Sequence, residues 1–501
     1  MKLNREILRL AVPSILAGIT VPLVGMVDMA VVGHLGTVEG LAGAALIGGI
    51  SVGTMLFDLL YWNFAFLRAG TGGLTAQAYG RQKMADQAGH DAPVMPGPDQ
   101  ASAEIGRILA RALRIALLSG VALIALQWVV VQLAFLVVDC SPEVRALATR
   151  YFYIRIWAAP ATLSLFALKG WFIGLQDTLR PMLTDLWVNL TNILLSVGLG
   201  FGLHAGAALG SGTVTLLPTL GFAGVAWGTV IAQWTGLFLA LLLARKYLSL
   251  SHFLKILCAK RAEDFQQNAD NQRVSDQPDS FFTLNRDLFL RSVGMIAVYI
   301  GFTVIGAGLG DRMLAVSSIL MKLLMLFSYF TDGFAYAGEA LTGRFIGEKN
   351  QDSVRSTVRG TFAWGFGLAG AFMLLYSLGG TPLLQLMTSD ASVVEAGRAF
   401  LPWLLLMPLI GCPAFTWDGI YIGATASKDL RNSTLLCAVG FFSVWFAGRW
   451  LLTSPGIGTL TPETSLHLLM AAYFVHLAIR SLYQTVRYPQ LMAQVFPAQN
   501  R

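Results

Sequence analysis

Asp28 stands in an otherwise mostly apolar stretch, residues 21–36, which reads VPLVGMVDMAVVGHLG. An aspartate near the centre of a membrane helix costs about 2.5–3.5 kcal/mol to insert and usually has a function. Apolar surroundings make a carboxyl hold its proton more tightly than water does, which suits reversible protonation. Pro22 removes the helical hydrogen bond to the carbonyl of Gly18, so we expect a helix hinge there. The alternatives are a neutral structural acid that is hydrogen-bonded to a neighbouring helix, and an acid near the extracellular mouth.

A second polar group lies in the stretch 183–204. Asn189, Asn192 and Ser196 follow the spacing i, i+3, i+7, so a helix would present them on one face. Amides hydrogen-bond to either form of a carboxyl, which a reversible proton site needs. The same side chains could instead hold neighbouring helices together.

The second half of the chain carries its own acids. Asp332, Tyr336 and Glu339 follow i, i+4, i+7 along one expected helix, and Asp418 lies in a later one. These residues could line a cation or substrate path, or form a sodium site. The alternative is that Glu339 is solvated near a helix end and that Asp332 is paired with a base.

Lys169 and Asp418 occupy matching positions in two similar segments, KGWFIG and DGIYIG. Their charges are opposite, so they are candidates for an ion pair that breaks and forms as two halves move. Arg68 and Asp58 offer other partners.

Composition sets the elements that must hold these residues. The chain has 501 residues, of which 55% are hydrophobic and 13% charged, and its mean hydropathy is +0.62. Soluble domains carry about 25% charged residues. Apolar runs of about 18 residues or more recur along the chain, each long enough to cross a bilayer as a helix. We therefore expect an all-α polytopic membrane protein whose first span is uncleaved.

We expect about twelve transmembrane helices, at residues 8–33, 42–68, 112–138, 151–174, 183–204, 221–244, 291–309, 314–340, 360–385, 399–424, 433–453 and 465–486. Lysines and arginines favour alternate connections, with exceptions in three other connections that carry Arg145 and Arg150, Arg312, and Arg398. By the positive-inside rule both termini are then cytoplasmic, which requires an even number of spans.

The chain divides into two similar halves. A polar, aromatic-poor segment separates residues 1–246 from 285–501, and we expect 247–284 to be a cytoplasmic linker between two six-helix lobes. GLTAQAYGRQK in the first half matches ALTGRFIGEKN in the second. Transporters built from such repeats bind substrate between the halves and move it by rocking one half against the other.

The chain resembles the multidrug and toxic compound extrusion (MATE) family, and within it the DinF (DNA-damage-inducible F) branch. The phrases that carry the resemblance include ITVPLVGMVDMAVVGHLG, FLRAGTGGLTAQAYG, KGWFIGLQDTLRPM and DGFAYAGEALTGRFIGEKN. The resemblance implies two pseudo-symmetric six-helix lobes across a cleft, in the inner membrane of a bacterium. It also implies export of amphipathic, often cationic, drugs in exchange for protons or sodium ions.

The resemblance assigns roles to residues. Asp28 matches the family's essential acid, Asn189 and Asn192 match asparagines of the fifth helix, and Thr229 matches a threonine of the sixth. Ser196 stands where several relatives carry a second aspartate. We therefore expect Asp28 to be the only acid of its lobe at this depth, and we favour protons over sodium, which needs a cage of several oxygens.

Other functions have weaker support. The sequence has no GxxxxGK[ST] phosphate loop and no HExxH motif, so we expect no enzyme activity, no cofactor, no metal site and no nucleic-acid partner. We expect a monomer in the lipid bilayer. A sodium-coupled exporter and a lipid-linked precursor flippase remain alternatives, although few basic residues fall within the expected spans, whereas flippases tend to have a cationic central cavity.

Overall fold

The computed structural model describes residues 2–35, 43–88, 98–138, 140–205, 214–247, 278–388, 390–453 and 461–497. Within these ranges, 12 helical segments are long and apolar enough to cross a membrane. The expected all-α membrane architecture is confirmed. Most of the linker 247–284 lies outside the described residues, and its last part already belongs to the helix that begins at Pro278.

The first half of the chain forms what we call the N-lobe. Its helices are α1 (Lys2–His34), α3 (Gly43–Trp62), α4 (Ala65–Ala88), α5 (Pro98–Ala125), α6 (Gln127–Val137), α7 (Pro142–Arg155), a 3-10 turn η1 (Ile156–Ala158), α8 (Ala159–Gly174), α9 (Leu179–Phe201) and α10 (Phe222–Ala244).

The second half forms the C-lobe. Its helices are α13 (Pro278–Ala307), α14 (Asp311–Gly347), α15 (Gln351–Met387), α16 (Ala391–Arg398), α17 (Leu401–Gly423), α18 (Ser427–Leu452) and α19 (Pro462–Val495).

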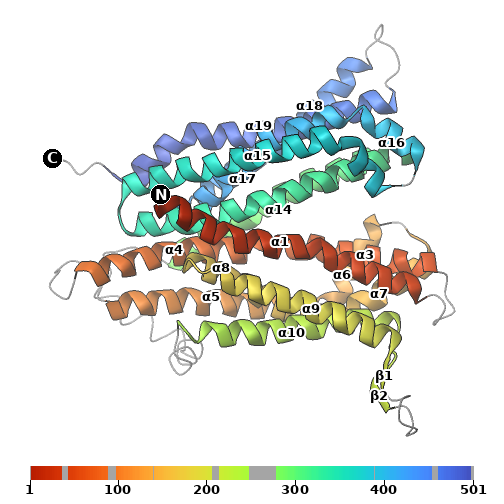
Figure 1. Ribbon diagram of the computed structural model, residues 1–501, viewed down its shortest axis with the longest axis horizontal. Coiled ribbons are helices and arrows are strands. Elements are labelled where there is room, and N and C mark those ends of the chain that lie inside the picture. The colour runs from red at the N-terminus through yellow and green to blue at the C-terminus, as the bar shows by residue number, and fades with distance from the viewer. Residues whose placement is uncertain are drawn as a thin grey trace.

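The lobes form two layers, with α1 to α10 in one and α14 to α19 in the other, and both chain termini lie at the same end (Figure 1). Each lobe has its own aromatic core: Phe57 stacks on Phe152 in the N-lobe, and Phe327 packs against Phe372 in the C-lobe. α1 connects them, because its first half packs on α14 through Leu10 and its second half packs within the N-lobe.

Several segments differ from the sequence expectation. The expected second span, 42–68, is broken between Trp62 and Ala65, and its helix continues to Ala88, so GLTAQAYGRQK is helical. A two-stranded antiparallel ribbon, β1 (Leu203–Ala205) and β2 (Val214–Leu217), projects at the end of the molecule opposite the termini (Figure 1).

The internal repeat corresponds to a repeated helix contact. A Cβ atom on Gly170 of α8 would collide with the backbone of Arg68 on α4. In the C-lobe, a Cβ atom on Gly419 of α17 would collide with the backbone of Ala335 on α14. The segments KGWFIG and DGIYIG therefore have the same structural role in their own lobes, where a glycine lets two helix backbones touch.

The two lobes also meet through glycines. α4 and α14 cross near their carboxyl ends, where Gly80 lies against the carbonyl of Arg344 and Gly347 lies against the carbonyl of Gln77. The Gln77 amide donates a hydrogen bond to the carbonyl of Gly423, 3.1 Å away. These contacts lie at the end of the bundle that holds the termini (Figure 1).

A buried ion pair adds to this crossing. Arg68 of α4 donates to the carboxylate of Glu339 on α14 at 2.9 Å, and the side chain of Glu339 is 0% exposed. The same guanidinium lies 4.5 Å from the ring centroid of Tyr336. Glu339 is thus a contact between lobes and not a solvated residue, so that interpretation of the sequence was wrong.

This ion pair gives a stability prediction. Glu339→Gln leaves Arg68 buried without its counter-charge, which should lower the free energy of unfolding by about 3–5 kcal/mol, whereas adding Arg68→Gln should recover much of the loss. Thermal unfolding of the purified variants measures the change. The exposed pair Arg312–Glu463 is the control, since Arg312→Gln should cost less than about 1 kcal/mol. Equal stability of Glu339→Gln and the parent would contradict the account.

Candidate functional site

Asp28 lies in a polar pocket inside the N-lobe. Its side chain is 8% exposed and faces the hydroxyl of Ser196 on α9. The Asn192 amide donates to the Thr229 hydroxyl of α10 at 2.8 Å. Three oxygens of this pocket have no hydrogen-bond partner among the residues that the structure describes: Asp28 Oδ1, Asn192 Oδ1 and Ser196 Oγ. Buried polar atoms are normally paired, so this group of acceptors is a place where a proton could be bound and exchanged.

Glycines bring the pocket's helices together. A Cβ atom on Gly228 of α10 would lie 2.9 Å from the Ser196 amide nitrogen, and one on Gly224 would collide with the backbone at Leu199. α9 and α10 therefore pack in backbone contact, which places Thr229 within reach of Asn192. Val31 and Val32 of α1 are buried, and they make the surroundings of the pocket apolar.

Two predicted residues lie outside the pocket. The Asn189 amide donates to the Thr20 hydroxyl at 2.6 Å, so it joins α9 to α1 two turns before Asp28. Gly18 packs against the backbone of Tyr329 on α14, where a Cβ atom would lie 3.5 Å from the carbonyl oxygen. The side chain of Pro22 lies outside the described residues, so the hinge stays a prediction.

A cation that the sequence analysis missed lies beside Asp28. The guanidinium of Arg155, at the end of α7, interacts electrostatically with Asp28, with Asp58 of α3 and with Tyr61. It donates to the Tyr151 hydroxyl at 3.2 Å and lies 4.8 Å from the ring centroid of Phe57. Asp28 is therefore not the only acid of its lobe near this depth. The sequence feature that could have identified Arg155 is the presence of an arginine within the expected span 151–174, in the segment RYFYIRIW.

The expected pair between Lys169 and Asp418 does not form. Lys169 binds Asp185 of α9 at 2.6 Å. In this conformation each of the two residues is paired within its own lobe, so an exchange of partners as the lobes move stays a prediction.

Asp418 is held inside the C-lobe. Arg291 of α13 and Arg480 of α19 both pair with its carboxylate, and the Gln484 amide donates to it at 3.2 Å. One carboxylate therefore serves two arginines, which leaves an excess of positive charge at this point.

Asp332 lies among four cations. It is half-buried and interacts electrostatically with cations from both lobes: Arg68, Arg480, Lys169 and Arg291. The statement that few basic residues fall within the spans is therefore wrong. The cations of this centre face an equal number of acids, Asp185, Asp332, Glu339 and Asp418, so the centre as a whole is close to neutral.

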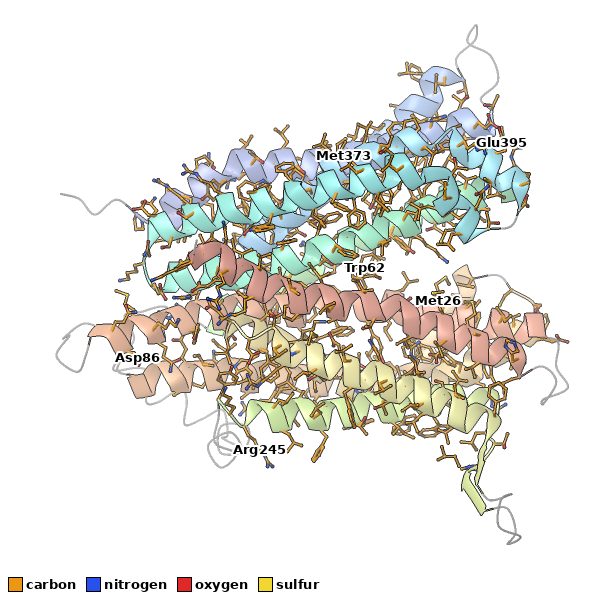
Figure 2. The ribbon with its side chains drawn as sticks, viewed as in Figure 1. Met26, Trp62, Asp86, Arg245, Met373 and Glu395 are labelled. Carbon is orange, nitrogen blue, oxygen red and sulfur yellow. The ribbon has the colours of Figure 1, made fainter. Side chains whose placement is uncertain are left out.

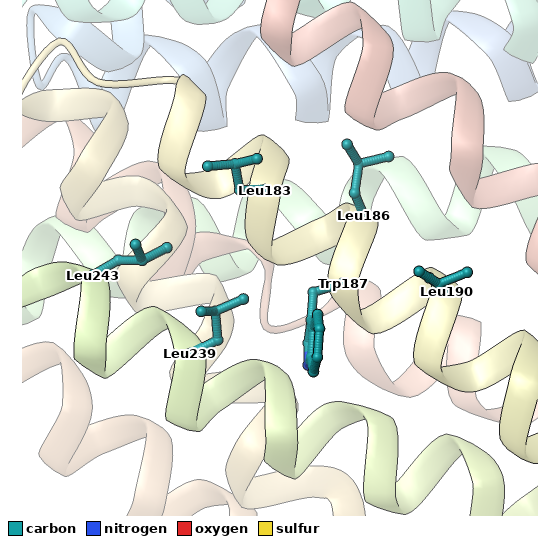
Figure 3. A pocket seen from close by; sticks show the side chains of 6 residues that line it. All are labelled: Leu183, Leu186, Trp187, Leu190, Leu239 and Leu243. Carbon is teal, nitrogen blue, oxygen red and sulfur yellow. The ribbon is translucent and has the colours of Figure 1, made fainter.

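A groove on the outer face of the N-lobe has a different character. It has a volume of about 360 Å³ and lies between α9 and α10 (Figure 3). Its lining residues are Leu183, Leu186, Trp187, Leu190, Leu239 and Leu243. Because none of these side chains is charged, the groove suits lipid chains and not a coupling ion.

The pattern GxSxG occurs once as Gly49-Ile50-Ser51-Val52-Gly53, but its context is not that of a hydrolase. The segment lies inside α3, whereas a nucleophile elbow joins a strand to a helix. Gly49 and Gly53 pack against Leu147 and Tyr151 of α7. These glycines serve helix packing.

Comparison with known proteins agrees with this architecture. The family model for MatE matches residues 101–198 and 288–445. DNA damage-inducible protein F of Escherichia coli (strain K12) is 32% identical over 96% of this chain and 90% of its own. Protein DETOXIFICATION 44, chloroplastic, of Arabidopsis thaliana is 24% identical over 95% of this chain and 81% of its own.

A solved structure described as the outward-facing conformation of a multidrug resistance MATE family transporter superimposes with a TM-score of 0.72. It is 17% identical, and the match covers 98% of this chain and 96% of the other. The chain is thus a multi-pass membrane transporter, and it belongs to the MATE family.

Proposed function

We propose that this protein is a secondary active antiporter that exports amphipathic, often cationic, compounds in exchange for protons. The pocket around Asp28 carries the proposal: a carboxyl, an amide and a hydroxyl are buried there, and each has an oxygen with no hydrogen-bond partner among the described residues. A titratable carboxyl beside an amide and a hydroxyl can bind a proton and release it again.

Rocking of the two lobes supplies the exchange. The glycine crossing and the Arg68–Glu339 pair join the lobes at the end that holds the termini. Breaking these contacts while new ones form at the opposite end would expose the space between the lobes to the other side of the membrane. We infer that the protein acts in this way as a monomer.

A lipid-linked precursor flippase is the second candidate, favoured by the four cations around Asp332. A pyrophosphate needs a net positive site, however, and these cations face an equal number of acids, as counted above. Growth of a flippase-deficient strain that carries this protein tests the alternative, and rescue would support it.

We also propose that the protein lies in the bacterial inner membrane with both termini in the cytoplasm. A reporter fused after Arg501, and another inserted within 247–284, should both give cytoplasmic signals, because basic residues concentrate on that side. A reporter placed within 454–460 is the matched control and should be periplasmic. A periplasmic signal from either of the first two would contradict the six-plus-six arrangement.

The central prediction concerns Asp28. Asp28→Asn has the hydrogen-bonding capacity of a protonated acid but cannot titrate, so dye efflux driven by an imposed pH gradient should fall by at least about tenfold. Asp28→Glu should keep part of the activity, and Ser196→Ala should be milder than Asp28→Asn. The assay uses proteoliposomes with matched amounts of protein.

The same assay distinguishes coupling to protons from coupling to sodium ions. A sodium gradient imposed without a pH gradient should not drive efflux in the parent. Efflux driven by sodium alone would favour the sodium-coupled alternative, which the three unpaired oxygens of the pocket also allow. Parental pH-driven efflux in Asp28→Asn would show that the acid is structural.

The C-lobe acid gives a separate prediction. Asp332 faces cations from both lobes, so Asp332→Asn should change the range of exported compounds while pH-driven efflux remains detectable. Efflux of several dyes of different charge, at matched expression, measures this. Complete loss of pH-driven efflux in Asp332→Asn would move the coupling site to the C-lobe.

A further inference from the structure

Asp58 is an acid that the pocket around Asp28 does not use. It lies on α3, its side chain is exposed, and no hydrogen bond or ion pair holds its carboxylate among the described residues. Tyr299 of α13 and Tyr329 of α14 interact with it electrostatically from the C-lobe. The carboxylate therefore lies within the electrostatic reach of the C-lobe.

Aromatic side chains from both lobes lie near this position. Trp62 follows Asp58 by one helical turn and lies between the lobes (Figure 2). Its ring meets Tyr299 edge-on, with centroids 5.4 Å apart. Tyr329 packs against α1 at Gly18. A carboxylate among aromatic rings is the chemistry that recognises organic cations, because ring faces and the acid both attract positive charge.

Arg155 connects this position to Asp28. Its guanidinium interacts with Asp28 from α1, with Asp58 and Tyr61 from α3, and with Tyr151 from its own helix. Asp28 itself faces Arg155, Tyr151 and the Ser196 hydroxyl. No ion pair joins the guanidinium to either acid in the described structure, so two carboxylates share one cation.

We propose that Asp58, with Trp62, Tyr299 and Tyr329, binds the cationic group of the exported compound, and that Arg155 links this binding to the proton on Asp28. The proposal rests on the proton exchange proposed above. The three charged groups carry a net charge of −1 when both acids are ionised. One proton or one organic cation neutralises them, so the two compete although they bind at different residues.

The competition has a definite direction. When Asp28 is ionised it attracts Arg155, which leaves the negative charge of Asp58 free for an organic cation. When Asp28 accepts a proton from solution, Asp58 is the only remaining acid for Arg155, and the guanidinium displaces the organic cation. Loss of the proton from Asp28 returns the site to its first state. This is the sequence of events that antiport requires.

Binding of ethidium, an organic cation, to the full-length protein in lipid nanodiscs tests the proposal by fluorescence polarisation across a pH series. The parent should bind more tightly as pH rises. Asp28→Asn should bind weakly at every pH, because Arg155 stays on Asp58. Arg155→Gln should bind tightly at every pH, because nothing competes for Asp58. The two substitutions thus have opposite effects on affinity.

Further variants complete the test. Asp58→Asn should weaken binding at high pH by at least about tenfold. Arg155→Lys keeps the charge and should keep the pH dependence, as should Arg150→Gln, which changes an exposed arginine of the same helix. If Arg155→Gln does not fold, as thermal unfolding would show, Asp58→Asn and Arg155→Lys decide the matter.

The outcomes separate the two claims. Parental pH dependence in Arg155→Gln, or parental affinity in Asp58→Asn, would overturn the link through Arg155 and leave the role of Asp28 intact. Parental pH dependence in Asp28→Asn would overturn the proton site itself.

Discussion

A charge inside the membrane must be balanced, and this requirement arranges the interior of the molecule. Arg68 binds Glu339 across the lobes, Lys169 binds Asp185 within the N-lobe, and Asp418 serves Arg291 and Arg480 within the C-lobe. Removing one member of such a pair costs several kcal/mol, so each pair fixes the position of the helices that carry it. Arg155 differs, because two acids face it and neither forms an ion pair with it. A charge that is balanced but not locked in one pair is suited to move during a transport cycle.

Glycines provide the second constraint. α8 meets α4 through Gly170, and α17 meets α14 through Gly419, so the same contact is built once in each lobe. At the crossing of α4 and α14, Gly80 and Gly347 let the two lobes themselves touch, backbone to backbone. Contacts within a lobe and contacts between lobes thus use the same residue type. Each lobe can move as a rigid body because its own helices are held in backbone contact.

The sequence predicted the membrane architecture because apolar runs of sufficient length have few other uses, and it located Asp28 because an acid in such a run is conspicuous. It did not predict the partners of the charged residues. Lys169 and Asp418 match in the repeat, but each packs into its own lobe, so Lys169 reaches Asp185 and Asp418 reaches Arg480. Arg155 was overlooked because Arg145 and Arg150, just before it, read as charges of a connection. The periodicity of apolar residues does not define the helix register across a break in the helix. The sequence alone therefore does not show on which side of the helix Arg155 lies.

If Arg155 links the two acids, binding of an organic cation expels a proton from Asp28. The direct measurement is the proton released when ethidium binds to the purified protein in weakly buffered solution, near the pH at which binding is half-maximal. The account predicts release of up to about one proton per bound cation in the parent and none in Asp28→Asn. Cation binding without proton release in the parent, or equal release in both proteins, would contradict it.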